Sequence, residues 1–275
     1  MTEQNQVARA DAFRRLHVPG DPVVIFNAWD AGSARAVAAA GAKAIGTGSW
    51  SVAAAHGFPD GEQLSLELAI ANLERIVRAV DLPVSIDLEA GYGPRPEDVS
   101  RSVTLAIRAG AIGINLEDGL DDEKGIRGVA DQVARIRAAR AAADSLSVPL
   151  YINARTDYFL QAESARHDAP LVAAAQERAA AYAAAGASGL FVPGIVKPEQ
   201  IRDICSSTAL PVNVMMMPSL PPRAELARLG VARISHGPGP YRAAMAFVEQ
   251  AARQALASRR IGLEQASTVS GSRRP

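Results

Sequence analysis

Short β-rich runs recur along the chain, and each begins after a Gly, Pro or polar residue and ends in polar residues. Runs of this length, bounded in this way, predict buried β-strands. Eight strands are predicted in this way: Val23–Asn27, Ala44–Ser49, Val84–Glu89, Gly113–Asp118, Leu150–Arg155, Gly189–Pro193, Val212–Met216 and Arg233–Ser235.

Ala-rich segments separate most of these runs, and their apolar residues recur at the spacing of a helix face. Three of the predicted helices lead directly into a strand across a similar Ala-Gly-Ala step, at Gly41, Gly110 and Gly186. A glycine just past the last helical turn ends a helix and begins a short connection to a strand. Strands and helices therefore alternate along the chain. Two clear helical patterns are Leu66, Ile70, Leu73, Ile76 and Val77, and Val99, Val103, Leu105 and Ile107.

The alternation predicts an α/β protein of the (β/α)₈ or TIM barrel class. Its 275 residues are close to the roughly 250 typical of one such barrel. No Gly-rich dinucleotide fingerprint follows the first strand, which argues against an open doubly wound sheet. We predict a single barrel domain at residues 1–257. Residues 258–275 are rich in Ser and Arg and predict a flexible tail.

Composition excludes several classes of partner. Lys plus Arg and Asp plus Glu both number 29, so no net charge draws the protein to nucleic acid or to an anionic membrane. The single cysteine, Cys205, rules out an internal disulfide and fits a reducing compartment. The N-terminal run is polar, and no stretch reaches the roughly 18 apolar residues of a membrane-spanning helix. We therefore expect a cytoplasmic protein that acts on a small molecule.

Three acids fall at the ends of two neighbouring predicted strands, where barrel enzymes build their active sites. Asp87 and Glu89 are two residues apart on one strand, so both are expected to point into the barrel. Glu117 ends the next strand. Mg²⁺ or Mn²⁺ prefers oxygen ligands of this kind, so the three acids predict a metal site. The alternative is that they form structural salt bridges with Arg155 or Arg95.

Two further strand ends offer groups for an anion. Arg155 presents a planar guanidinium that matches a carboxylate or a phosphonate. Small residues surround Gly48 and Ser49, before Trp50, so backbone N–H groups there could hold an anion. A tight strand-to-helix loop without a ligand explains the same small residues.

Four motifs, taken in order, resemble the isocitrate lyase and phosphoenolpyruvate mutase superfamily over nearly the whole chain. The family's four motifs are the run Asp-Ala-Asp-Thr-Gly-Tyr-Gly, a strand that ends in Glu-Asp, a strand that ends in Ala-Arg-Thr-Asp and a Gly-X-Pro-Asp turn. In this chain they read Asp87-Leu88-Glu89-Ala90-Gly91-Tyr92-Gly93, Gly113-Ile114-Asn115-Leu116-Glu117-Asp118, Ala154-Arg155-Thr156-Asp157 and Gly57-Phe58-Pro59-Asp60.

The resemblance implies a Mg²⁺ site at the three acids and a substrate oxyanion on Arg155 and on the backbone near Gly48, Ser49 and Trp50. It also implies that Asp60 lies close to the reacting centre and acts in catalysis with Arg155. It further suggests Asp87 and Asn213 as substrate-binding residues. Members of this superfamily exchange their last helix between barrels, so the resemblance implies a swapped helix at Tyr241–Leu256 and a homodimer or homotetramer.

The segment after Glu117 departs from the family's isocitrate and methylisocitrate lyases. Those enzymes carry a Lys-Lys/Arg-Cys-Gly-His motif there, but Gly119–Gly128 holds neither Cys nor His. Its terminal glycines and charged centre predict a mobile lid. We therefore expect a Mg²⁺-dependent lyase or hydrolase that breaks a C–C or P–C bond next to a 2-oxo-carboxylate, with oxaloacetate-like or phosphonopyruvate-like substrates. The alternatives are an aldol-type transferase of the ketopantoate hydroxymethyltransferase kind and a non-catalytic barrel that binds a metal and a small acid.

Overall fold

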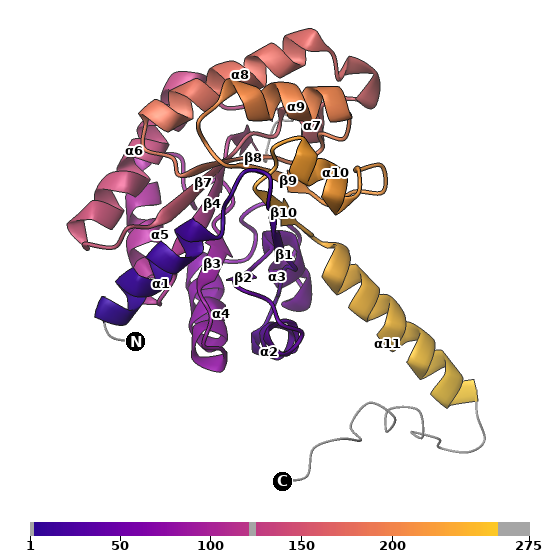
Figure 1. The fold of residues 1–275 in the computed structure, drawn as a ribbon. Helices are drawn as coiled ribbons and strands as arrows, with labels where there is room; N and C mark the ends of the chain where they lie inside the picture. The colour runs from indigo at the N-terminus through magenta and orange to yellow at the C-terminus, as the bar shows by residue number, and fades with distance from the viewer. Residues whose placement is uncertain (1–2, 121–124, 258–275) are drawn as a thin grey trace.

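Eight parallel strands form one sheet in the computed structural model, which describes residues 3–120 and 125–257. Their spatial order is β1-β10-β9-β8-β7-β4-β3-β2. The first and last of these, β1 and β2, meet through a parallel bridge between Ala28 and Thr47, so the sheet curls into a nearly closed barrel (Figure 1). The strands are β1 Val23–Ile25, β2 Ile45–Gly46, β3 Val84–Asp87, β4 Gly113–Glu117, β7 Tyr151–Arg155, β8 Gly189–Val192, β9 Val212–Met215 and β10 Arg233–Ser235.

Helices surround the strands, as expected for a (β/α)₈ barrel, and the predicted fold class is confirmed (Figure 1). The chain also forms a short antiparallel pair, β5 Gly119–Leu120 with β6 Gly125–Ile126, at the base of the predicted lid. The central lid residues, 121–124, lie outside the described residues. The helices are α1 Glu3–Arg15, α2 Ala31–Ala39, α3 Ser49–Ala55, α4 Leu66–Ala79, α5 Pro96–Arg108, α6 Val129–Ser145, α7 Tyr158–Gln161, η1 Ser164–Arg166, α8 Ala169–Ala184, α9 Pro198–Ser207, α10 Arg223–Arg228 and α11 Gly239–Ala257.

The helix faces predicted from apolar spacing are the ones that pack on the sheet. On α4, Leu73 and Ile76 are fully buried, and on α5, Val99 and Val103 are fully buried in the same core. Helices α2, α5 and α8 end just before the predicted glycines, and Gly41, Gly110 and Gly186 all have positive φ. Because glycine adopts this left-handed conformation at little cost, the chain can turn directly from each helix into the next strand.

The N-terminal helix closes one end of the barrel. Ala10 and Phe13 of α1 pack against Val23, Ile25 and Tyr151, which lie near the beginnings of β1 and β7. The Tyr151 ring also stacks on His17 at a centroid distance of 4.1 Å. The opposite end, where the carboxyl ends of the strands meet, is therefore the one available for a ligand.

The last helix does not cover its own barrel. Helix α11 leaves the barrel at its first turn and extends away from it (Figure 1), and Pro240 is its only buried residue among those described. Phe247 and Val248 are 71% and 55% exposed. The predicted tail at 258–275 lies outside the described residues. Within the described part of the chain, no helix has the length and apolar character needed to cross a membrane.

Candidate functional site

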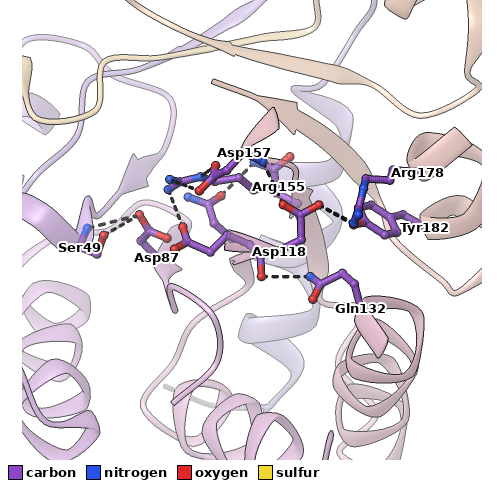
Figure 2. Close-up of polar contacts among 11 residues, drawn as sticks. Ser49, Asp87, Asp118, Gln132, Arg155, Asp157, Arg178 and Tyr182 are labelled. Carbon is purple, nitrogen blue, oxygen red and sulfur yellow. Dashed lines mark hydrogen bonds and ion pairs between the residues drawn. The ribbon is translucent and has the colours of Figure 1, made fainter. Parts of the chain in front are cut away.

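Two predicted site residues meet at the carboxyl ends of neighbouring strands. Glu117 ends β4 and Arg155 ends β7, and the two are register partners. Arg155 Nη1 lies 2.7 Å from Glu117 Oε2, while Arg155 Nε and Nη2 lie 2.5 and 2.9 Å from the two carboxylate oxygens of Asp157. Figure 2 shows the Arg155 guanidinium held by Asp157, with Asp87 facing the same space. The arginine is thus fixed in position by two acids.

Asp87 ends β3 and has one carboxylate oxygen without a partner. Its Oδ2 accepts hydrogen bonds from the backbone N–H and the hydroxyl of Ser49, at 3.3 and 3.2 Å (Figure 2). Its Oδ1 is buried and has no hydrogen-bond partner among the described residues. A buried carboxylate oxygen without a donor is costly, so this atom marks a place where a cation or a water molecule is needed.

Glu89 does not follow the strand pattern that the sequence suggested. Strand β3 ends at Asp87, and Glu89 lies beyond it with a left-handed φ of 51°. Its Oε2 accepts hydrogen bonds from the N–H groups of Gly61 and Glu62 at 3.0 and 2.6 Å, and its Oε1 accepts one from the Tyr92 hydroxyl at 3.2 Å. The alternation of side chains between two faces holds only within a strand, so the prediction that Asp87 and Glu89 point to the same face does not apply beyond the end of β3.

Burial and repulsion by neighbouring carboxylates raise the pKa values of Glu89, Glu117 and Asp60. Burial raises the pKa of Glu89 to about 8, hydrogen bonding by Glu62 opposes this, and the charge of Asp87 adds to it. Burial also raises the pKa of Glu117 well above its ordinary value, against the lowering effect of Arg155. The pKa of Asp60 is raised by burial and by the charge of Asp87. Ionising all of these acids together is therefore unfavourable, even though Arg155 lowers the pKa values of Glu117 and Asp60.

The acids fit a hard divalent cation that keeps part of its water shell. Among the described residues, no three Asp, Glu, His or Cys side chains converge as a complete metal-ligand cluster. Mg²⁺ is commonly bound through one or two carboxylates, with several waters retained. The free Oδ1 of Asp87, with Glu117 and Glu89 nearby, meets that requirement, and a bound cation would relieve the repulsion between the acids.

Two residues of the loop predicted to hold an anion, Ser49 and Trp50, make contacts within the protein. Gly48 is the N-cap of α3, a helix of only seven residues, and the next residue, Ser49, directs both its donors at Asp87. The Trp50 ring lies under the Arg242 guanidinium at 4.5 Å and edge-on to Tyr241 at 6.0 Å. Trp50 thus joins this loop to the beginning of α11.

A cavity of about 190 Å³ opens at these strand ends. Most of the predicted substrate-binding residues line it, whereas Asn213 does not and instead exchanges hydrogen bonds with the Ser235 side chain. Its lining residues are Asn27, Gly48, Ser49, Trp50, Asp60, Asp87, Asn115, Arg155, Leu160, Phe191, Met215, Ser235, Gly237 and Pro238.

Sequence reasoning missed the apolar wall of this cavity, which includes Leu160, Phe191 and Met215. Phe191 and Met215 lie on predicted strands, where apolar residues are expected to belong to the core. The structure shows that Phe191 is the register partner of Arg155, so the two residues lie at the same level of the barrel. Without the register between strands, that level could not be assigned.

A buried network behind the site was also missed. The Asp118 carboxylate accepts hydrogen bonds from the backbone N–H of Asp157, from Arg178 at 3.0 Å and from the Tyr182 hydroxyl at 2.6 Å (Figure 2). Asp118 thereby fixes the segment that carries Asp157, the residue that holds Arg155. Gln132 anchors the same region by donating to the Glu117 carbonyl.

Comparisons with known proteins agree on one family. The family model described as phosphoenolpyruvate phosphomutase matches residues 13–256. An uncharacterised protein of Mycobacterium tuberculosis is 34% identical over 88% of each chain, and an oxaloacetate decarboxylase of Pseudomonas entomophila is 30% identical over 85% of this chain and 80% of its own. Among solved structures, a candidate phosphonomutase from Burkholderia cenocepacia J2315 is 54% identical, with a TM-score of 0.89 over 90% of this chain and 99% of its own.

Proposed function

Because the chain belongs to the phosphoenolpyruvate phosphomutase family, within a superfamily of lyases and mutases, we propose that it is a divalent-metal-dependent lyase of a small 2-oxo acid. It breaks a C–C bond next to the 2-oxo-carboxylate and leaves a pyruvate-type enolate. The observation that carries this proposal is the buried Oδ1 of Asp87, which has no hydrogen-bond partner in the described part of the chain and belongs to a residue that lines the same cavity as Arg155.

Asp87 and Glu117 are the residues that would hold the cation, while Glu89, whose oxygens accept hydrogen bonds from Gly61, Glu62 and Tyr92, would add negative charge nearby. When bound, Mg²⁺ or Mn²⁺ supplies positive charge beside the carboxylate and keto oxygens of the substrate, where negative charge develops as the bond breaks. Glu117 and Asp157 fix the Arg155 guanidinium so that it orients the substrate carboxylate. This orientation requires no movement of the arginine when the substrate arrives.

Asp60 is the proposed acid–base residue. It lines the cavity, and its raised pKa keeps its carboxyl group protonated at a higher pH than an ordinary aspartate. A group of this kind can accept a proton from the substrate and return one to the enolate carbon. Gly119–Gly128 carries no Cys or His for that role, so we assign isocitrate and methylisocitrate cleavage to its relatives and not to this chain.

The test is pyruvate release from a panel of 2-oxo acids, measured with Mg²⁺, with Mn²⁺ and with EDTA. Pyruvate release is expected to require the cation. It should fall by more than about tenfold in Asp87→Asn, because losing a metal ligand reduces activity at least as much as losing a residue that hydrogen-bonds to a ligand. Asp203→Asn, an exposed aspartate on α9, is the matched control. Full activity of Asp87→Asn, or full activity of the wild type in EDTA, would contradict the metal assignment. Binding of a 2-oxo acid without pyruvate release would indicate a non-catalytic barrel.

The protein is proposed to act as a homo-oligomer. Helix α11 contributes only Pro240 to the described core and exposes Met245, Phe247 and Val248. Exchange of this helix with a second copy would bury these side chains in a closed, symmetric assembly.

A further inference from the structure

The cavity has a single cation in its described lining, the Arg155 guanidinium. Its Nη1, Nε and Nη2 atoms already contact the carboxylates of Glu117 and Asp157. A guanidinium has five N–H groups, so these three contacts leave two, which suit one carboxylate. The other charged side chains of the described lining are Asp60 and Asp87. Asp87 and Glu117 would match the charge of the proposed cation, so Asp60 is left to repel a second anionic group on the ligand.

Three backbone N–H groups beside the cavity are also engaged, those of His236, Gly237 and Ser49. Those of His236 and Gly237 both donate to Asn27 Oδ1, at 2.9 Å each. The N–H and hydroxyl of Ser49 donate to Asp87 Oδ2. These four donors therefore point at protein acceptors and are not available to a second anionic group of the ligand.

One side of the cavity is apolar, although Asn27, Asn115 and Ser235 also line the cavity. Phe191 lies beside Arg155, whose guanidinium carbon is 5.9 Å from the centroid of the phenyl ring. The Phe191 residue is only 4% exposed. Met215, Leu160 and Pro238 continue this wall. A charged group placed against such a surface loses its water without gaining a partner, whereas an alkyl group gains contacts.

We propose that the substrate is a 4-hydroxy-2-oxo monocarboxylic acid with a short alkyl end, which this chain cleaves to pyruvate and an aliphatic aldehyde. This inference rests on the proposed function and specifies its substrate class. The single carboxylate binds at Arg155, and the alkyl end packs on Phe191, Met215 and Leu160. A cavity of about 190 Å³ is below the roughly 300–1,000 Å³ of sites for drug-sized ligands, so the alkyl end is short.

The reaction balances without any oxidant or reductant. The Asp60 carboxylate takes the proton of the 4-hydroxyl group, the C3–C4 bond breaks, and C4 becomes the aldehyde carbon. The electron pair of the broken bond passes into the enolate of pyruvate. A proton then returns to C3, so substrate and products have the same atoms.

The experiment compares kcat/KM for 4-hydroxy-2-oxopentanoate, 4-hydroxy-2-oxohexanoate, oxaloacetate and phosphonopyruvate, with pyruvate and aldehyde measured separately. The hydroxy acids are expected to be cleaved at least tenfold faster than either dianionic acid. The hexanoate is expected to exceed the pentanoate by about tenfold, the lower end of what one methylene contributes in a matching pocket.

A charge variant tests the wall directly. Leu160→Arg places a cation in the cavity at a position that is already 41% exposed, so the fold is expected to tolerate it. It should reduce the preference for hydroxy acids over oxaloacetate by at least tenfold, while Leu68→Arg, equally exposed on α4, leaves that preference unchanged. Met215→Ala should remove the advantage of the hexanoate over the pentanoate.

The outcomes separate the two proposals. Faster cleavage of oxaloacetate by the wild-type chain overturns the substrate class and leaves the proposed C–C lyase function in place, whereas faster cleavage of the P–C bond of phosphonopyruvate overturns both. An unchanged preference in both Leu160→Arg and Met215→Ala also overturns it, because the wall would then not contact the substrate. No pyruvate release from any acid, with the cation present, overturns the lyase function and this inference together.

Discussion

Arg155 Nη1 lies 2.7 Å from Glu117 Oε2 across the β4–β7 pair, and both side chains are largely excluded from solvent, at 16% and 10% exposure. Burial lowers the pKa of Arg155, but Glu117 and Asp157 more than offset this and raise it above its ordinary value. The guanidinium therefore stays charged, and its position is set by the two acids before any substrate binds.

Replacement of this arginine by lysine is expected to weaken substrate binding. In Arg155→Lys, a point charge cannot contact Glu117, Asp157 and a substrate carboxylate together. We expect KM to rise by about tenfold or more, in line with the loss of one charge-assisted hydrogen bond. Steady-state kinetics check this, with Arg137→Lys, an exposed arginine on α6, as the control. An equal KM in both variants would remove Arg155 from the substrate site.

Stability without metal is expected to fall as the pH rises from about 4.5 towards 8. Burial raises the pKa of Glu89 from 4.5 to about 8, so between these values the folded chain binds a proton that the unfolded chain has released. The folded state then binds more protons, and the free energy of unfolding decreases with pH, by up to about 1.4 kcal/mol per pH unit for one group.

Urea denaturation in EDTA across this pH range measures the slope. Glu89→Gln should flatten it, because the amide does not titrate. Glu177→Gln, an exposed glutamate on α8, should keep the wild-type slope. A slope that is identical in wild type and Glu89→Gln would show that Glu89 does not carry this dependence.

Arg135 is expected to be essential for the loop that follows β3. It is fully buried, and its guanidinium donates to the carbonyls of Ala90, Gly93 and Pro94. This loop includes Tyr92, whose φ is 58°. Arg135→Met leaves the three carbonyls without these donors, so we expect a loss of about 3 kcal/mol or more of unfolding free energy. Chemical denaturation checks this, and Arg137→Met, exposed on the same helix, should change stability by no more than about 0.5 kcal/mol.

The mass of the particle in solution tests the role of α11. We expect sedimentation equilibrium at micromolar concentration to give a multiple of the 28.8 kDa chain mass. Met245→Asp should shift the mass towards one chain, because it places a charge in the apolar stripe, whereas Gln250→Glu on the same helix should not. A wild-type mass of one chain would contradict the exchanged helix.

Local patterns along the chain were sufficient to predict the barrel. All eight strands lie within the runs that predicted them, although β1, β2 and β3 end at Ile25, Gly46 and Asp87, two or three residues before their predicted ends. Gly41, Gly110 and Gly186 end their helices with positive φ. These features depend on backbone conformation and on the burial of one face, which residues close in sequence decide. Asp87, Glu117 and Arg155 could be placed at the strand ends for the same reason.

Tertiary structure decided which partner each of these groups has. Nothing in the order of residues shows that Glu89 turns away to the N–H groups of Gly61 and Glu62, or that Ser49 donates to Asp87. Phe191 looked like a core residue until its register with Arg155 placed it on the cavity wall. Contacts between strands and loops distant in sequence depend on the barrel's register and closure, which periodicity along the chain does not determine.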